Sequence, residues 1–268
     1  MAKQNSIINL RGKVGDTVFT RGKNGYSAKP APKKGTAAQK KKGKQPQNLR
    51  MGALNALAGQ ISGALKFYGY PFTPGSFYKR LMKRFHLEKS DARILLLDSL
   101  ERMEVNDDYK FGELYPDMHV NAVEKKSALT VCLDLRHYPI DRKSINCFYM
   151  QVIVLMWNSA DEVVIHEGKK TDWISFNDPL PLYCDIDFKK PAKASDYLVA
   201  CRIVTGRNGH STEDFPSQGI RIFTIGSFTK EGKQLLAERQ AARELRQKER
   251  PVKREEVKEE RVALRRRK

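Results

Sequence analysis

Lys and Arg residues are closely spaced near the start of the chain, and their side chains are suited to bind phosphate groups. The first 50 residues contain thirteen Lys or Arg and one acid, a net charge of +12 out of +19 for the chain. Such a segment neutralises phosphates and releases counterions without reading base sequence. The residues predicted to bind nucleic acid here are Arg11, Lys13, Arg21, Lys23, Lys29, Lys33, Lys34, Lys40, Lys41, Lys42, Lys44 and Arg50.

Two further basic groups lie later in the chain, and a solvated helix face is the alternative interpretation for them. Residues 51–228 hold 22 basic and 22 acidic residues, whereas residues 229–268 hold 15 basic and 8 acidic residues, a net charge of +7. The basic excess is therefore confined to the two ends, where it can hold an anionic partner. The additional candidates for phosphate contact are Lys79, Arg80, Lys83, Arg84, Arg265, Arg266, Arg267 and Lys268.

The expected partner is nucleic acid rather than a membrane surface. Neither basic end has the Trp, Phe and Leu face that buries a helix among lipid headgroups. The longest apolar run, Cys147 to Trp157, is about half the length that a membrane-spanning helix needs. The start, MAKQNSIINL, lacks the apolar run of a secretory signal. We therefore expect a protein of the cytoplasm, or of a virion assembled there, that makes no membrane contact.

The residues that usually carry catalysis are present but scattered. Five histidines lie in different segments without an HExxH or HxxxH spacing, and no GxSxG, P-loop or GxGxxG motif occurs. Asp185 and Asp187 could offer two carboxylates to a divalent cation, but paired acids on a strand more commonly face solvent. We expect no catalytic residues, no metal site, no cofactor and no enzymatic activity.

The cysteines indicate a reducing compartment. They are widely spaced, each lies in an apolar run typical of a strand, and none forms a CxxC motif. Buried free thiols are the simplest interpretation, and a disulfide pair is the alternative. The four residues are Cys132, Cys147, Cys184 and Cys201.

The N-terminal basic residues are predicted to lie on a hairpin and a flexible tether. Residues 13–20 and 26–29 have strand character, and Asn24-Gly25 favours a tight turn between them. Residues 30–46 are rich in Lys, Gly, Ala and Pro and contain nothing that could form a packed core. The hairpin therefore needs a surface to pack on, because two strands alone are not stable.

The rest of the chain is predicted to be an antiparallel β-sandwich flanked by helices. Apolar spacing predicts one helix over residues 47–68, with Asn48 as its N-cap, and another over residues 77–87. About seven short apolar segments with turn signals between them predict the sandwich. The fold class is mainly β with flanking helices, and the domains are residues 1–46 (hairpin and basic tether), 47–90 (helical segment), 91–228 (β-sandwich) and 229–268 (long basic C-terminal helix).

The N-terminal part also resembles a known family. The segment GKVGDTVFTRGKNGYSAKPAP, a tether rich in Thr, Ala, Gln and Lys, and the helix that follows are similar to the start of a family of uncharacterised proteins common in Bacteroidota. The resemblance covers residues 11–65 and implies an all-β body, but no activity. A weaker resemblance, at residues 15–25, is to the KOW element of ribosomal and transcription proteins, which favours RNA.

These features together predict a non-enzymatic structural protein that binds nucleic acid through basic terminal arms, within a ribonucleoprotein or a virion. The alternative is an interaction module whose β-sandwich binds copies of itself or another protein, with the arms contacting acidic protein surfaces. Nuclease treatment distinguishes the two, because it releases only the first kind of complex.

Overall fold

The computed structural model divides the chain into two compact units, Met1–Met51 and Gly52–Lys268. We describe each unit by itself. The residues that the structure describes are 2–3, 12–14, 17–22, 25–30, 46–69, 75–106, 111–115, 117–138, 145–211, 218–245 and 247.

The first unit contains a four-stranded antiparallel sheet in the order β1-β4-β3-β2. Strands β3 and β4 pair from Thr17↔Pro30 to Gly22↔Gly25, which confirms the predicted hairpin. The segment predicted as one strand over residues 13–20 instead contributes to two strands, β2 and β3, which pair with each other. The strands are β1 (Ala2–Lys3), β2 (Gly12–Val14), β3 (Thr17–Gly22) and β4 (Gly25–Pro30).

The centre of the second unit is a six-stranded antiparallel sheet built on two long strands, β7 and β11. Strands β8 and β9 pair with β7, and strands β12 and β13 pair with β11. Most residues of β7 and β11 are buried, because both faces of these strands are covered. The strands are β7 (Cys147–Asn158), β8 (Val163–Lys170), β9 (Ile174–Ser175), β11 (Ala194–Arg207), β12 (His210–Ser211) and β13 (Gln218–Ser227).

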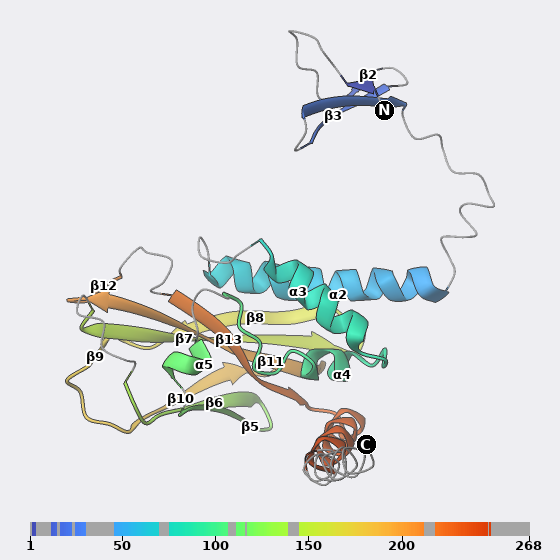
Figure 1. Ribbon diagram of the computed structural model, residues 1–268. Coiled ribbons are helices and arrows are strands. Elements are labelled where there is room, and N and C mark those ends of the chain that lie inside the picture. Colours follow the sequence, from blue (N-terminus) through green and yellow to red (C-terminus); the bar gives the residue numbers. More distant parts are fainter. Residues whose placement is uncertain are drawn as a thin grey trace, which may run out of the picture. The chain divides into compact units, whose positions relative to one another are not determined.

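A second, three-stranded antiparallel sheet covers one face of the large sheet (Figure 1). It comprises β5 (Met118–Glu124), β6 (Ala128–Leu135) and β10 (Leu182–Lys189), in the order β10-β6-β5. Alternate residues of β6, such as Val131 and Leu133, share a core with alternate residues of β7 and β11. Two antiparallel sheets packed face to face confirm the predicted sandwich.

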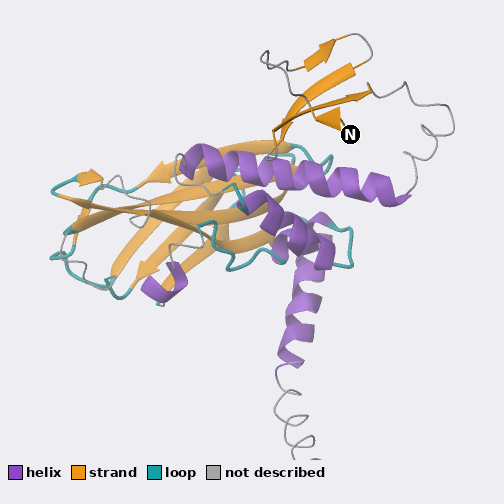
Figure 2. Ribbon diagram, turned by 45° about the horizontal axis from the view of Figure 1, so that its top comes forward, coloured by secondary structure: helices purple, strands orange, loops and turns teal. Residues whose placement is uncertain are grey.

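Helices cover the other face of the large sheet, as Figure 2 shows. They are α2 (Pro46–Gly69), α3 (Phe77–Leu87) and α4 (Arg93–Asp98). Buried residues of α2 and α3 form one core with Trp157 and its neighbours on the sheet. From Gly52 onward, the helices thus belong to the same unit as the strands of residues 91–228.

Several local predictions differ from the structure. Helix α2 begins at Pro46, so Asn48 lies in its first turn rather than at the N-cap. Proline suits that place because the first helical N–H has no partner within the helix. Residues 92–105, whose apolar run suits either a strand or the start of a helix, contain α4, and a short helix, α5 (Phe111–Leu114), follows. Strand β5 was not predicted.

The C-terminal helix is described over residues 230–245, which confirms the start of the predicted helix. Thr229 precedes it, and its Oγ1 accepts a hydrogen bond of 3.1 Å from the backbone N–H of Gly232. This is the N-cap arrangement that satisfies one of the unpaired donors of the first turn. The remainder of the predicted helix, from residue 248 onward, lies outside the described residues.

Gln60 of α2 ties the helical layer to the large sheet. Its Oε1 accepts a hydrogen bond of 2.8 Å from Nε1 of the fully buried Trp157, and its Nε2 donates to the Asp161 carbonyl. We expect Gln60→Leu to lower the free energy of unfolding by about 1–3 kcal/mol, because the buried indole N–H loses its acceptor. Urea denaturation measures this loss, and Gln234→Leu on the exposed C-terminal helix is the control. Equal stability of the two variants would contradict the prediction.

Candidate nucleic-acid interface

Only part of the predicted interface lies within the described residues. Lys13 of β2 and Lys29 of β4 are both paired with Val18 of β3, so the three residues form one row across the first unit's sheet. Arg21 of β3 is paired with Tyr26, and Arg50 lies partly buried in α2. The predicted residues outside the described part are Arg11, Lys23, Lys33, Lys34, Lys40, Lys41, Lys42, Lys44, Arg265, Arg266, Arg267 and Lys268.

Helix α3 carries the best-defined basic surface. Phe77, Leu81 and Phe85 recur at helical spacing and are fully buried, which fixes the face that α3 turns to the sheet. Lys79, Lys83 and Arg84 are exposed. We call these three residues the α3 basic surface. Among the described residues, no carboxylate forms an ion pair with any of the three. They therefore stay available to an external anion.

Arg80 does not belong to this surface, although the sequence placed it with Lys79, Lys83 and Arg84. Its guanidinium donates hydrogen bonds to the backbone carbonyls of Glu104, at 2.9 Å, and Val105, at 2.5 Å. It also lies 5.7 Å from the centre of the Phe77 ring. Arg80 thus holds the segment after α4 against α3, and its contact with phosphate stays a prediction.

The described part of the C-terminal helix uses its cations to bind the body of the same chain. Arg239 forms ion pairs of 2.6 Å with both Glu88 and Asp98, and Arg243 forms pairs of 2.6 Å with Asp98 and 3.2 Å with Glu101. Lys233 pairs with Glu124 of β5 at 2.6 Å. These residues are neutralised internally, so this helix segment is docked rather than free to contact a polyanion.

The docking of the C-terminal helix should depend on pH through Glu88. Burial alone would raise the pKa of Glu88, but hydrogen bonds from Arg239 and from the backbone N–H groups of Ser90 and Lys89 hold that pKa below its ordinary value. A lowered carboxyl pKa stabilises the docked state above the ordinary pKa of about 4.3, and this contribution is lost as the pH falls through the folded-state pKa.

We therefore expect hydrogen-exchange protection factors over residues 230–245 to fall between about pH 5 and pH 3. Protection factors are suitable because they correct for the intrinsic pH dependence of exchange. In Glu88→Gln, this acid transition should be weaker. An identical transition in the variant would show that Glu88 does not control docking.

The candidate metal-binding acids have other partners. Asp187 accepts hydrogen bonds from Thr130 Oγ1, at 2.5 Å, and from Lys125 Nζ, at 3.3 Å, and these contacts hold its pKa below the ordinary value. The described residues contain no group of three His, Cys, Asp or Glu side chains arranged to hold a metal ion. All four cysteines are free. Cys147 and Cys201 are buried, and Cys132 and Cys184 are partly buried.

Comparison of the chain with protein-family models, with curated proteins and with solved structures finds no match in any of the three. The resemblance of residues 11–65 to the Bacteroidota family therefore stays a prediction. None of the described helices combines the length and the apolar character that crossing a bilayer requires.

Proposed function

We propose that the protein is a non-enzymatic structural component that binds nucleic acid through phosphate contacts, within a ribonucleoprotein or a virion. The observation that carries the proposal is the partition of charge. A neutral body, residues 51–228, separates ends of net charge +12 and +7. A field concentrated at the ends of a neutral fold attracts a polyanion and steers its association.

The pairing of cations within the second unit supports the same conclusion. Arg93 and Arg239, which pack against the body, are each neutralised by carboxylates. The α3 basic surface is different, since its three cations are exposed and none is within ion-pair distance of a described acid. Such cations position a phosphate backbone without selecting bases, so we expect little sequence preference.

An interaction module that binds acidic protein surfaces is the second candidate. The observation that favours it is the docking of Arg239 and Arg243 on Glu88, Asp98 and Glu101, which shows cations of this chain engaging carboxylates on a protein surface. In this case the arms would lace neighbouring proteins together, and nuclease treatment would leave the assembly intact.

The test is salt-dependent binding of mixed-sequence single-stranded RNA and DNA, followed by fluorescence anisotropy between about 50 and 300 mM salt, a range over which screening of charges increases strongly. We expect a variant that lacks residues 1–45 and 248–268 to lose most of the affinity. These end points keep residues 230–245, which dock on the body. Undiminished affinity of the truncated chain would overturn the proposal.

The α3 basic surface provides a milder test. We expect replacement of Lys79, Lys83 and Arg84 by Gln to reduce the slope of log K against log salt by up to about 0.9 for each phosphate that these side chains neutralise. The matched control replaces three exposed lysines on other elements, Lys126, Lys189 and Lys193, by Gln. A control variant that lowers the slope as much would show that only the total charge matters.

A further inference from the structure

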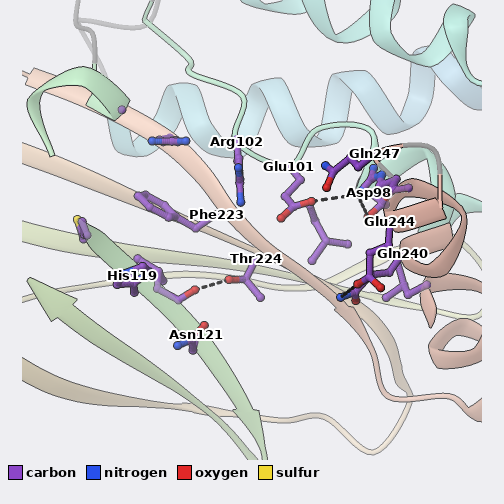
Figure 3. A pocket seen from close by; sticks show the side chains of 17 residues that line it. Asp98, Glu101, Arg102, His119, Asn121, Phe223, Thr224, Gln240, Glu244 and Gln247 are labelled. Atoms are coloured by element: carbon purple, nitrogen blue, oxygen red, sulfur yellow. Dashed lines mark hydrogen bonds and ion pairs between the residues drawn. The ribbon is translucent and has the colours of Figure 1, made fainter. Parts of the chain in front are cut away.

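An open groove lies between strands β5 and β13 and the C-terminal helix, next to the segment after α4 (Figure 3). Its volume is about 780 Å³, which is in the range of pockets that bind small molecules. His119, Asn121 and Phe223 lie toward one end, and Asp98, Gln240 and Glu244 lie toward the other. None of the residues that the sequence predicts to bind nucleic acid lines this groove.

Arg102 lines the groove from an unusual backbone conformation. Its φ of 62° lies in the left-handed region, which residues other than Gly, Asn and Asp seldom adopt. Hydrogen bonds of 2.9 Å, from Arg102 N to the Ile222 carbonyl and from Ile222 N to the Met103 carbonyl, fasten this turn to β13. The structure thus presents an exposed arginine where a glycine would be least strained.

Arg221 of β13 is the second guanidinium at the groove, and its neighbours fix its position. It lies 5.3 Å from the centre of the Phe223 ring, and on another side it meets Gly112, where an added Cβ would lie 2.5 Å from Nη1. Its Nε is buried without a hydrogen-bond partner among the described residues. Burial lowers the pKa of Arg221, and nearby Arg102 lowers it further, against the attraction of Glu104.

The groove therefore holds two cations that form no ion pair among the described residues, although Glu104 attracts Arg221 from a longer distance. Among the described residues, neither Arg102 nor Arg221 forms an ion pair, and Glu104 Oε1 accepts a hydrogen bond from Gly112 N. Arg243, by contrast, is neutralised by Asp98 and Glu101 at the other end. Two guanidiniums without an ion pair in one groove are suited to bind a phosphate group.

From this geometry we infer that the groove binds the phosphate monoester of a nucleotide, with Arg102 and Arg221 as the phosphate ligands. Phe223 supplies an aromatic surface, and Asn121 and Gln240 supply donors and acceptors for a base or sugar. The acids at the other end oppose a long polyanion and favour a single phosphate-bearing group. The inference goes beyond the proposed function, because backbone binding by the arms requires no pocket.

The experiment is calorimetric titration of the full chain with adenosine 5′-monophosphate, adenosine and inorganic phosphate, in high salt to screen the charges of residues 1–45 and 248–268. We expect saturable binding of the monophosphate, competition by inorganic phosphate and no binding of adenosine. Arg102→Gln should weaken binding of the monophosphate by about tenfold or more, because the variant loses a charge-assisted hydrogen bond to the phosphate. Arg207→Gln, which alters an exposed arginine on β11, should leave the affinity unchanged.

Arg102→Gly separates binding from folding, because glycine accepts the positive φ without strain. We expect this variant to unfold at the same or a higher temperature than the unaltered chain but to bind the monophosphate much more weakly. Undiminished affinity in both Arg102 variants, equal binding of adenosine, or no saturable binding of the monophosphate would each overturn the inference.

Two further measurements identify the source of the phosphate and separate this site from the arms. Stronger binding of a 5′-phosphorylated trinucleotide than of the monophosphate would support the inference and assign the groove to strand ends, whereas the reverse would support a free nucleotide as its ligand. Arg102→Gln should keep the affinity for mixed-sequence nucleic acid that depends on residues 1–45. Absence of monophosphate binding alone would refute the groove inference, and absence of mixed-sequence nucleic-acid binding alone would refute the proposed function.

Discussion

Replacing the six lysines at 33, 34, 40, 41, 42 and 44 by Gln should lower the affinity for mixed-sequence nucleic acid by about three orders of magnitude at low salt. Each lysine that meets a phosphate contributes up to about 0.9 to the salt slope, so the whole set contributes about 5. The substitution keeps the length of the segment and removes only its charge. Anisotropy titrations at several salt concentrations give both the affinity and the slope.

The control for this variant tests whether the position of the charge matters. Six exposed lysines of the second unit, replaced by Gln, give the same change in net charge and leave residues 33–44 intact. They are Lys66, Lys89, Lys126, Lys170, Lys189 and Lys193. If both variants lose affinity equally, binding reflects net charge alone. If the tether variant keeps its slope, the tether does not touch phosphate.

The second large effect is expected from Arg93→Ala, which should lower the free energy of unfolding by about 3–5 kcal/mol. The Arg93 side chain is 12% exposed and pairs with Asp196, which is 9% exposed. It also donates hydrogen bonds of 2.7 Å to the Asn158 carbonyl and to Ser195 Oγ. The variant leaves the Asp196 carboxylate buried without its partner. Urea denaturation with a constant slope measures the loss.

Two comparisons distinguish the effect of a buried charge from the effect of simply shortening a side chain. Arg136→Ala removes an arginine that is 57% exposed and pairs with Asp134. This variant should lower the free energy of unfolding by less than about 1 kcal/mol. The double variant Arg93→Ala with Asp196→Ala should regain part of the lost stability, because no unpaired carboxylate remains. A double variant less stable than Arg93→Ala would contradict this explanation.

The parts of the fold with a strong local signal could be predicted from the sequence. The alternating residues of β6 and the long apolar run of β7 are local patterns, and the turn signal Asn208-Gly209 matches positive φ values at both residues. The segment around α4 was ambiguous because six apolar-rich residues suit a strand or a helix equally well. Its helical form depends on packing against Ile220 and Ile222, which lie more than 100 residues away.

The candidate sites were less predictable for the same reason. On α3, Lys79, Arg80, Lys83 and Arg84 look equivalent in sequence, and only the carbonyls of Glu104 and Val105 separate Arg80 from the others. Likewise, Arg239 and Arg243 resemble the rest of a basic arm until Glu88 and Asp98 are seen beside them. The groove depends on five separate segments, so no local pattern indicates it.

The two covered faces of β7 and β11 have a consequence for how their neighbours find the right alignment. In a sheet with one wet face, a shift of one residue exposes apolar side chains, and this penalty specifies the alignment. When both faces of a sheet are buried, the sizes of the side chains must specify the alignment instead of their polarity. Tyr197 lies directly opposite Gly226, and an added Cβ there would lie 2.2 Å from the phenol ring. The Trp173 ring fills the space beside Gly206 in the same way. Because these large rings fit only beside a glycine, a shifted alignment of the strands would produce steric clashes.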